Sequence, residues 1–123
     1  MALELRKMSG TFGVEVMGID LAEGVSANEA SLLQAALRDR LVMVIKNQNI
    51  SPKQYVDGIK VFGDPMHQHL AKLLMDEHPE IAVLDSRVAN SKSADGKIMP
   101  IGSKDWHTDH TNHAKPPKMT VLY

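Results

Sequence analysis

The stretch LVMVIKNQNISPKQYVDGIKVFGDP, from Leu41 to Pro65, combines the two patterns that decide the fold. Residues 41–48 are a mainly apolar run, rich in β-branched side chains and bounded by polar ones, which predicts a buried strand. Ser51, Pro52 and Gln54 then give the start signal of a helix: a capping residue, a proline at the first helical position, and a side chain that closes a capping box. The sequence therefore predicts a strand followed directly by a helix.

The same start signal occurs upstream of this stretch. Ser26 precedes Glu29 by three residues, which is a second capping box, and it predicts a helix over about residues 27–39. Both helices carry apolar residues at the spacing of a single buried face. These residues are Ala30, Leu33, Leu37 and Leu41 in the first helix, and Tyr55, Ile59 and Phe62 in the second.

Three further strands and one long loop complete the predicted order. Short β-rich runs at residues 14–19, 80–86 and 118–123 predict strands, and Gly10 and Gly13 are typical of turns. Residues 90–103 are polar and contain glycine, which predicts a long loop of the kind that usually serves a site. No glycine fingerprint follows any strand, so we expect an α+β domain over residues 1–123, with helices packed beside a sheet.

Composition excludes several classes of function. The chain has 123 residues and no cysteine, so disulfides, thiolate nucleophiles and cysteine-based zinc sites are excluded. Its 14 basic and 15 acidic residues form no stripe of one sign, which argues against a nucleic-acid partner. No apolar run reaches the length of a membrane span or of a signal peptide. We expect a globular protein of a reducing compartment, the cytoplasm.

The segment KDWHTDHTNHAKPP, residues 104–117, is the richest in chemistry. It places three histidines and one aspartate within seven residues, which leaves a metal site, a helical histidine patch or a polar loop as interpretations. A helix is disfavoured because Thr, Asp and Asn fill the gaps and two prolines follow. In an extended segment His107 and Asp109 point to the same side and can bind one ion, while Thr108 points away.

An imidazole and a carboxylate supply two of the three ligands of the 2-His-1-carboxylate triad that holds Fe(II). The residue pattern does not identify the third ligand, which would be another histidine. An alternative is a structural zinc or nickel site built from His107, Asp109, His110 and His113. The more distant candidates for the third ligand are His67, His69 and His78.

Several segments in order resemble the N-terminal half of the taurine/2,4-D dioxygenase-like family of Fe(II)- and 2-oxoglutarate-dependent oxygenases. The opening FGVEVMGIDL, the Leu41–Pro65 stretch, HPEIAVLD, WHTD and KPPKMTVLY are each similar to the family's corresponding segments. The resemblance implies a partial double-stranded β-helix, or jelly roll, with the N-terminal helices packed beside the sheet. It implies Fe(II) as the metal and 2-oxoglutarate as cosubstrate.

The resemblance also implies roles for individual residues. His107 and Asp109 match the first two metal ligands, and Trp106 matches the aromatic position before them. Where the taurine enzymes use a histidine and an asparagine to bind the substrate, this chain has His67 and His69 around the first position and Ser103 at the second. We therefore expect His67, His69, Ser103 and Trp106 to bind a small organic substrate whose class these departures leave open.

Two hypotheses follow, because the family's distal histidine and its 2-oxoglutarate-binding threonine and arginine lie beyond the matched region, which ends at Tyr123. In the first, the chain belongs to a dioxygenase that hydroxylates its substrate and is completed by further polypeptide. In the second, it is a catalytically inactive fragment or an oligomerising module, with an orphaned His/Asp pair. An unpaired terminal strand would favour a homo-oligomer.

Overall fold

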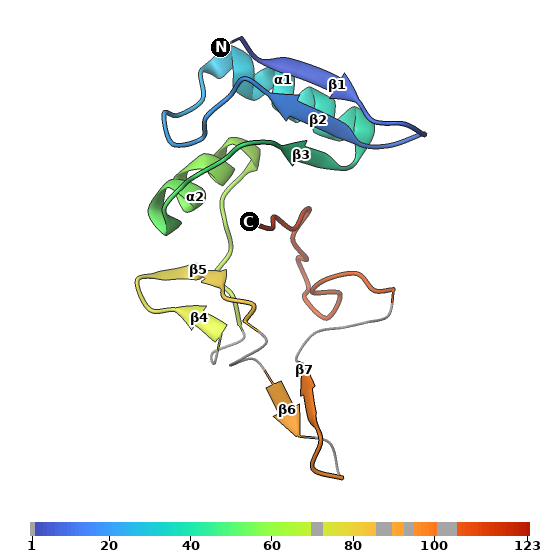
Figure 1. Cartoon of the computed structure of the whole chain (residues 1–123), viewed down its shortest axis with the longest axis vertical. Coiled ribbons are helices and arrows are strands. Elements are labelled where there is room, and N and C mark those ends of the chain that lie inside the picture. Colours follow the sequence, from blue (N-terminus) through green and yellow to red (C-terminus); the bar gives the residue numbers. More distant parts are fainter. Residues whose placement is uncertain (1, 70–72, 86–89, 93–94, 101–105) are drawn as a thin grey trace. The chain divides into compact units, whose positions relative to one another are not determined.

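The structure is a computed structural model that describes residues 2–69, 73–85, 90–92, 95–100 and 106–123. The chain divides into two compact units, Met1–Pro65 and Met66–Tyr123. Figure 1 shows that the first unit holds both α-helices and one sheet, whereas the second is built from short strand pairs and irregular segments. Within the described residues, no helix is long and apolar enough to cross a membrane.

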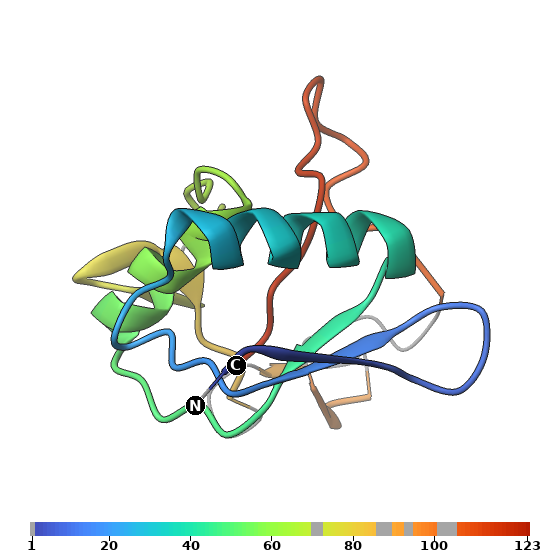
Figure 2. The same ribbon diagram turned by 90° about the horizontal axis from the view of Figure 1, so that it is seen from above.

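The first unit is a three-stranded sheet covered by a helix. Strands β1 (Glu4–Lys7), β2 (Val14–Met17) and β3 (Met43–Ile45) lie in that order, with β1 antiparallel and β3 parallel to β2. Parallel neighbours need a long crossover connection, and helix α1 (Ala27–Arg40) provides it. Figure 2 shows α1 along one face of the sheet, where Val14, Val16 and Leu33 are almost completely buried.

The predicted capping box of α1 is confirmed. The Ser26 hydroxyl accepts from the backbone N–H of Glu29, and the Glu29 carboxylate accepts from the backbone N–H of Ser26. The prediction that Leu41 lies on the inner face is wrong. Leu41 ends the helix with a left-handed backbone (φ 65°), which turns its side chain outward to 74% exposure.

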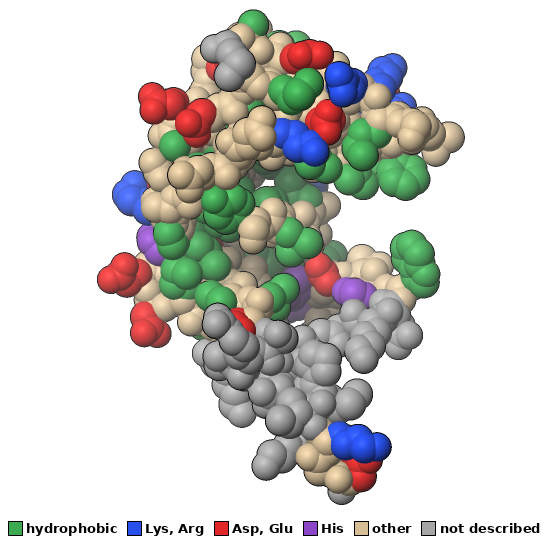
Figure 3. Space-filling view, viewed as in Figure 1, with side chains coloured by type: hydrophobic (Ala, Val, Ile, Leu, Met, Phe, Trp, Pro, Cys, Tyr) green, Lys and Arg blue, Asp and Glu red, His purple; other side chains and the backbone are tan. Residues whose placement is uncertain are grey.

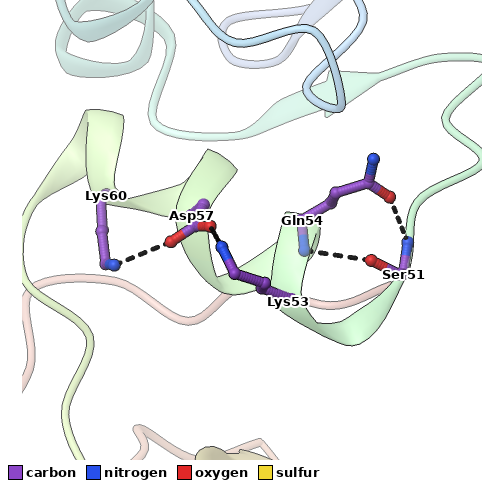
Figure 4. A network of polar contacts seen from close by, with 5 residues as sticks. All are labelled: Ser51, Lys53, Gln54, Asp57 and Lys60. Atoms are coloured by element: carbon purple, nitrogen blue, oxygen red, sulfur yellow. Dashed lines mark hydrogen bonds and ion pairs between the residues drawn. The ribbon is translucent and has the colours of Figure 1, made fainter.

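Helix α2 (Pro52–Ile59) begins at the predicted cap, where Ser51 and Gln54 exchange the two hydrogen bonds drawn in Figure 4. A single turn of 3-10 helix, η1 (Lys60–Phe62), continues it and ends at Gly63, whose φ of 141° suits glycine. The most buried positions of α2 are Val56 and Gly58. The predicted inner-face residues Tyr55, Ile59 and Phe62 are half-buried.

The second unit contains two antiparallel strand pairs. Strands β4 (Leu74–Met75) and β5 (His78–Ala82) form one pair, and β6 (Asn90–Lys92) and β7 (Ile98–Pro100) form the other. The strand predicted over residues 80–86 overlaps β5. Residues 90–103, predicted as a loop, contain the β6–β7 hairpin instead, with Gly96 at φ 79° in its connection. An Asp-Gly pair at residues 95–96 is a strong turn signal that the loop prediction overlooked.

The strand predicted over residues 118–123 is absent from the described residues. Strand propensity expresses a fit to a pleated, half-buried surface. Here Leu122 and Tyr123 are 79% and 72% exposed, so no such surface covers them. The mixed α+β class is confirmed, in the form of three small sheets.

Candidate metal centre

The His-x-Asp pair lies in an irregular segment of the second unit. The Nε2 atom of His107 is 3.2 Å from Oδ1 of Asp109, and the two side chains are 50% and 42% exposed. Residues 106–108 have no regular secondary structure and Asp109 begins a turn, so the two side chains meet where the chain enters this turn. The arrangement places one imidazole nitrogen beside one carboxylate oxygen at a solvent-accessible position.

The second oxygen of Asp109 is also engaged. The hydroxyl of Thr120 donates to Oδ2 of Asp109 at 2.7 Å. This hydrogen bond is the largest cause that lowers the pKa of Asp109, and the adjacent charge of His107 adds to it. Both contacts favour the ionised carboxylate, which is the form that binds a divalent cation.

The other two histidines of this segment, His110 and His113, group with His69. The His113 ring centroid lies 4.8 Å from that of His69 and 5.2 Å from that of His110, and the centroids of His69 and His110 are 6.4 Å apart. The backbone turns directly after the pair, because His110 adopts φ 54° and its carbonyl accepts from the N–H of His113 at 3.0 Å. This turn directs the rings of His110 and His113 to His69, while the charge of His110 also contributes to the lowered pKa of Asp109.

The structure does not support the alternative of a zinc or nickel site built from His107, Asp109, His110 and His113. Among the described residues, no group of three or more histidine, aspartate or glutamate side chains could hold a metal ion. The imidazole–carboxylate pair fits two positions of a site for iron, manganese or zinc by its donor chemistry. A third protein ligand would have to come from a different segment.

The predicted substrate-binding residues differ in where they lie. His69 belongs to the three-histidine group, and the N–H of Gln68 donates to the carbonyl of Pro79 at 2.9 Å, which holds the 67–69 segment beside β5. His67 is exposed. Trp106, next to His107, is fully exposed, and Ser103 lies outside the described residues.

Thr120 contacts this centre although the sequence did not suggest it. It lies within the run predicted as a strand, 11 residues from Asp109, and no spacing rule connects the two residues. A hydrogen bond of this kind depends on how the intervening chain turns. The sequence signal that could have drawn attention to Thr120 is only that it is a polar residue in an apolar run.

Known proteins that are similar to this chain identify its family. Curated relatives and solved structures that match the chain include dioxygenases dependent on alpha-ketoglutarate, which is 2-oxoglutarate. The family model described as "Taurine catabolism dioxygenase TauD, TfdA family" matches residues 4–123. This chain belongs to the TauD/TfdA family.

The relatives place the match within a longer protein. An alpha-ketoglutarate-dependent sulfate ester dioxygenase of Pseudomonas putida is 26% identical over 98% of this chain and 36% of its own length. An alkylsulfatase of Acinetobacter baylyi is 24% identical over 98% of this chain and 34% of its own length. The chain therefore spans about a third of the length of the curated relatives that it matches.

Solved structures support the same relationship. A taurine dioxygenase from Burkholderia xenovorans is similar with a TM-score of 0.60 and 27% identity, over 72% of this chain and 33% of that protein. The structure of AAD-2 in complex with Mn(II) and N-oxalylglycine matches with a TM-score of 0.50 and 26% identity, over 53% of this chain and 26% of that protein.

Proposed function

We propose that this chain is part of an Fe(II)- and 2-oxoglutarate-dependent dioxygenase that hydroxylates a small organic substrate. The observation that carries the proposal is the His107 Nε2 to Asp109 Oδ1 approach of 3.2 Å, in a chain of the TauD/TfdA family. The AAD-2 complex supports a divalent metal and a 2-oxo acid as the missing components, because its N-oxalylglycine carries a similar carboxylate-and-carbonyl pair.

In this proposal His107 and Asp109 hold the metal from one side. His107 offers the lone pair of a neutral imidazole, and Asp109 offers a carboxylate oxygen that is ionised at neutral pH. The metal, when bound with its cosubstrate, supplies the oxygen-activating chemistry. The chain's own contribution is to bind and orient, and the third ligand comes from a segment outside the described pair.

The fold and substrate parts of the proposal rest on family membership. We propose that the strands of this chain belong to a jelly roll, and that His67, His69, Ser103 and Trp106 face the substrate. His69 is supported by its place among three imidazoles, which can hydrogen-bond an anionic or polar group. The sulfate ester named for the Pseudomonas putida relative makes organic sulfates a reasonable first class of substrate to test.

Anaerobic calorimetric titration with Fe(II), with and without 2-oxoglutarate, tests this function. We expect Fe(II) to bind the wild-type chain. We expect 2-oxoglutarate to strengthen this binding if a second copy of the chain supplies the remaining ligands across an oligomer interface. His107→Ala should abolish Fe(II) binding, because it removes one of two protein ligands. His113→Ala is the matched control and should leave binding intact, since His113 packs with His69. Binding that survives His107→Ala would contradict the proposal.

One observation favours a second candidate function. The described residues bring together only two potential ligands, so the pair in this chain does not form a complete triad. The chain would then be a catalytically silent fragment or an oligomerising module with an orphaned His/Asp pair. Fe(II) binding that is weak and indifferent to 2-oxoglutarate would favour this candidate. A cytoplasmic location remains a prediction under either one.

A further inference from the structure

We infer that Thr120 is a positioning residue of the metal centre: its hydroxyl holds one oxygen of Asp109 and thereby leaves the other oxygen, beside His107, to the metal. This inference rests on the proposed function and deepens it. It adds a residue outside the His-x-Asp pair that sets the orientation of one ligand.

The two oxygens of Asp109 have different neighbours. Oδ2 accepts from the Thr120 hydroxyl at 2.7 Å, whereas Oδ1 lies 3.2 Å from Nε2 of His107. A carboxylate has several lone pairs, but a hydroxyl bound at one oxygen restricts rotation about the terminal torsion. Oδ1, the oxygen beside the His107 imidazole, is then the one that can serve as a metal ligand. A metal bound beside His107 would therefore meet Oδ1 of Asp109, while Oδ2 stays with Thr120.

The pair needs such support because it is not enclosed by other side chains. His107 and Asp109 are about half exposed, so their side chains would otherwise sample several rotamers. Ordering a side chain opposes binding by its lost rotamer entropy. A hydrogen bond made before the metal arrives removes part of this loss, which is the effect that partners behind a ligand usually have.

The segment that leads from Asp109 to Thr120 contains residues that restrict its backbone conformation. The left-handed backbone of His110 reverses the chain, and Pro116 and Pro117 then lie between the turn and Thr120. Proline fixes φ near one value, so the unfolded segment has fewer conformations to lose. The hydroxyl reaches Asp109 across 11 residues of sequence. The two prolines therefore reduce the entropy that is lost when Thr120 is placed beside Asp109.

Cobalt(II) binding to the full chain tests the inference, with calorimetry for affinity and visible absorption for coordination. We expect Thr120→Val and Thr120→Ala to weaken Co(II) binding by about tenfold, at the lower end of the range for such partners because the bond is exposed. Thr120→Ser keeps the hydroxyl and should retain wild-type affinity and spectrum. Thr111→Val removes a hydroxyl from the same segment and should change neither.

The serine and alanine variants differ by one oxygen atom, so a general loss of structure would affect both. Equal affinities of Thr120→Ser and Thr120→Ala would overturn the inference, as would wild-type affinity in Thr120→Val. Circular dichroism of each variant confirms that it is folded. A wild-type chain that binds no Co(II), or that binds it equally after His107→Ala, would overturn the proposed function and the inference together. Normal wild-type binding with an indifferent Thr120 overturns the inference alone.

Discussion

The side-chain amide of Gln48 joins two segments that lie far apart in the sequence. Its Nε2 donates to the carbonyls of Ile19 and Lys46 at 2.9 and 2.8 Å, and its Oε1 accepts from the N–H of Leu21 at 2.9 Å. One side chain thus satisfies three backbone groups where β2 and β3 end. This explains the glutamine in a stretch that otherwise encodes a strand and a helix.

We expect Gln48→Ala to lower the free energy of unfolding by roughly 1–3 kcal/mol, because it leaves part-buried backbone groups without these partners. Gln48→Glu should also destabilise, since a carboxylate cannot donate to the two carbonyls. Urea unfolding measures both. Asn49→Ala, an exposed neighbour, is the control and should have a small effect. Wild-type stability in Gln48→Glu would show that the donated bonds contribute little.

At the candidate centre, the sequence predicted that His107 and Asp109 lie together, but it did not predict the contact of Thr120 with Asp109. His107 and Asp109 are two residues apart, so a contact between them is local and can be expected from their spacing. The association of His110 and His113 with His69 depends on a left-handed turn at His110, and non-glycine residues adopt that conformation rarely. Local patterns do not predict such a turn.

At the level of elements, the two helices were predictable because their signals are local. Each capping box lies within four residues of sequence, and both form as predicted. The strands were predicted less well, since a strand forms only where another presents its backbone groups. The apolar run at residues 118–123 has strand propensity but forms no strand, whereas the polar residues 90–92 pair with 98–100.

Helix α2 has an ion-pair cluster whose contribution should depend on pH. Lys53 and Lys60 both bind Asp57, and these hydrogen bonds lower the pKa of Asp57 from 3.8 to about 2; Figure 4 shows the three side chains along α2 and η1. A carboxylate with a depressed pKa in the folded state stabilises that state in full above pH 3.8. The contribution is lost as pH falls through about 2.

Thermal unfolding of the wild type and of Asp57→Asn, compared between pH 6 and pH 2, tests this expectation. The wild type should have the higher Tm at pH 6, and the difference should shrink as pH falls from about 4 to about 2, the interval between the two pKa values. High salt should reduce the difference at pH 6, because the pair is exposed and salt screens it. A Tm difference that is constant with pH would contradict the assignment.

For the whole molecule, the distribution of exposed side chains decides where self-association could occur. On the sheet face opposite α1, Glu15 pairs with Arg6 and Lys46, so this face is charged. Figure 3 shows acidic and basic side chains beside one another over this part of the first unit. Burying such a network would require its desolvation, which disfavours an interface. The segment 118–123 instead exposes apolar side chains: Met119, Val121, Leu122 and Tyr123.

If the chain is a homo-oligomer, as in the second candidate function, we expect its contact to involve the apolar residues 118–123 and not the charged sheet face. Leu122 is 79% exposed, and Leu122→Lys places a charge in that contact, so we expect it to shift the sedimentation coefficient toward that of a monomer. Val44→Lys, at 38% exposure on the sheet face, should leave the wild-type sedimentation unchanged. A wild-type chain that sediments as a monomer at micromolar concentration would refute self-association. If Leu122→Lys leaves an oligomer intact and Val44→Lys dissociates it, the interface lies on the sheet face. Charge complementarity between the copies, and not apolar burial, would then stabilise the contact.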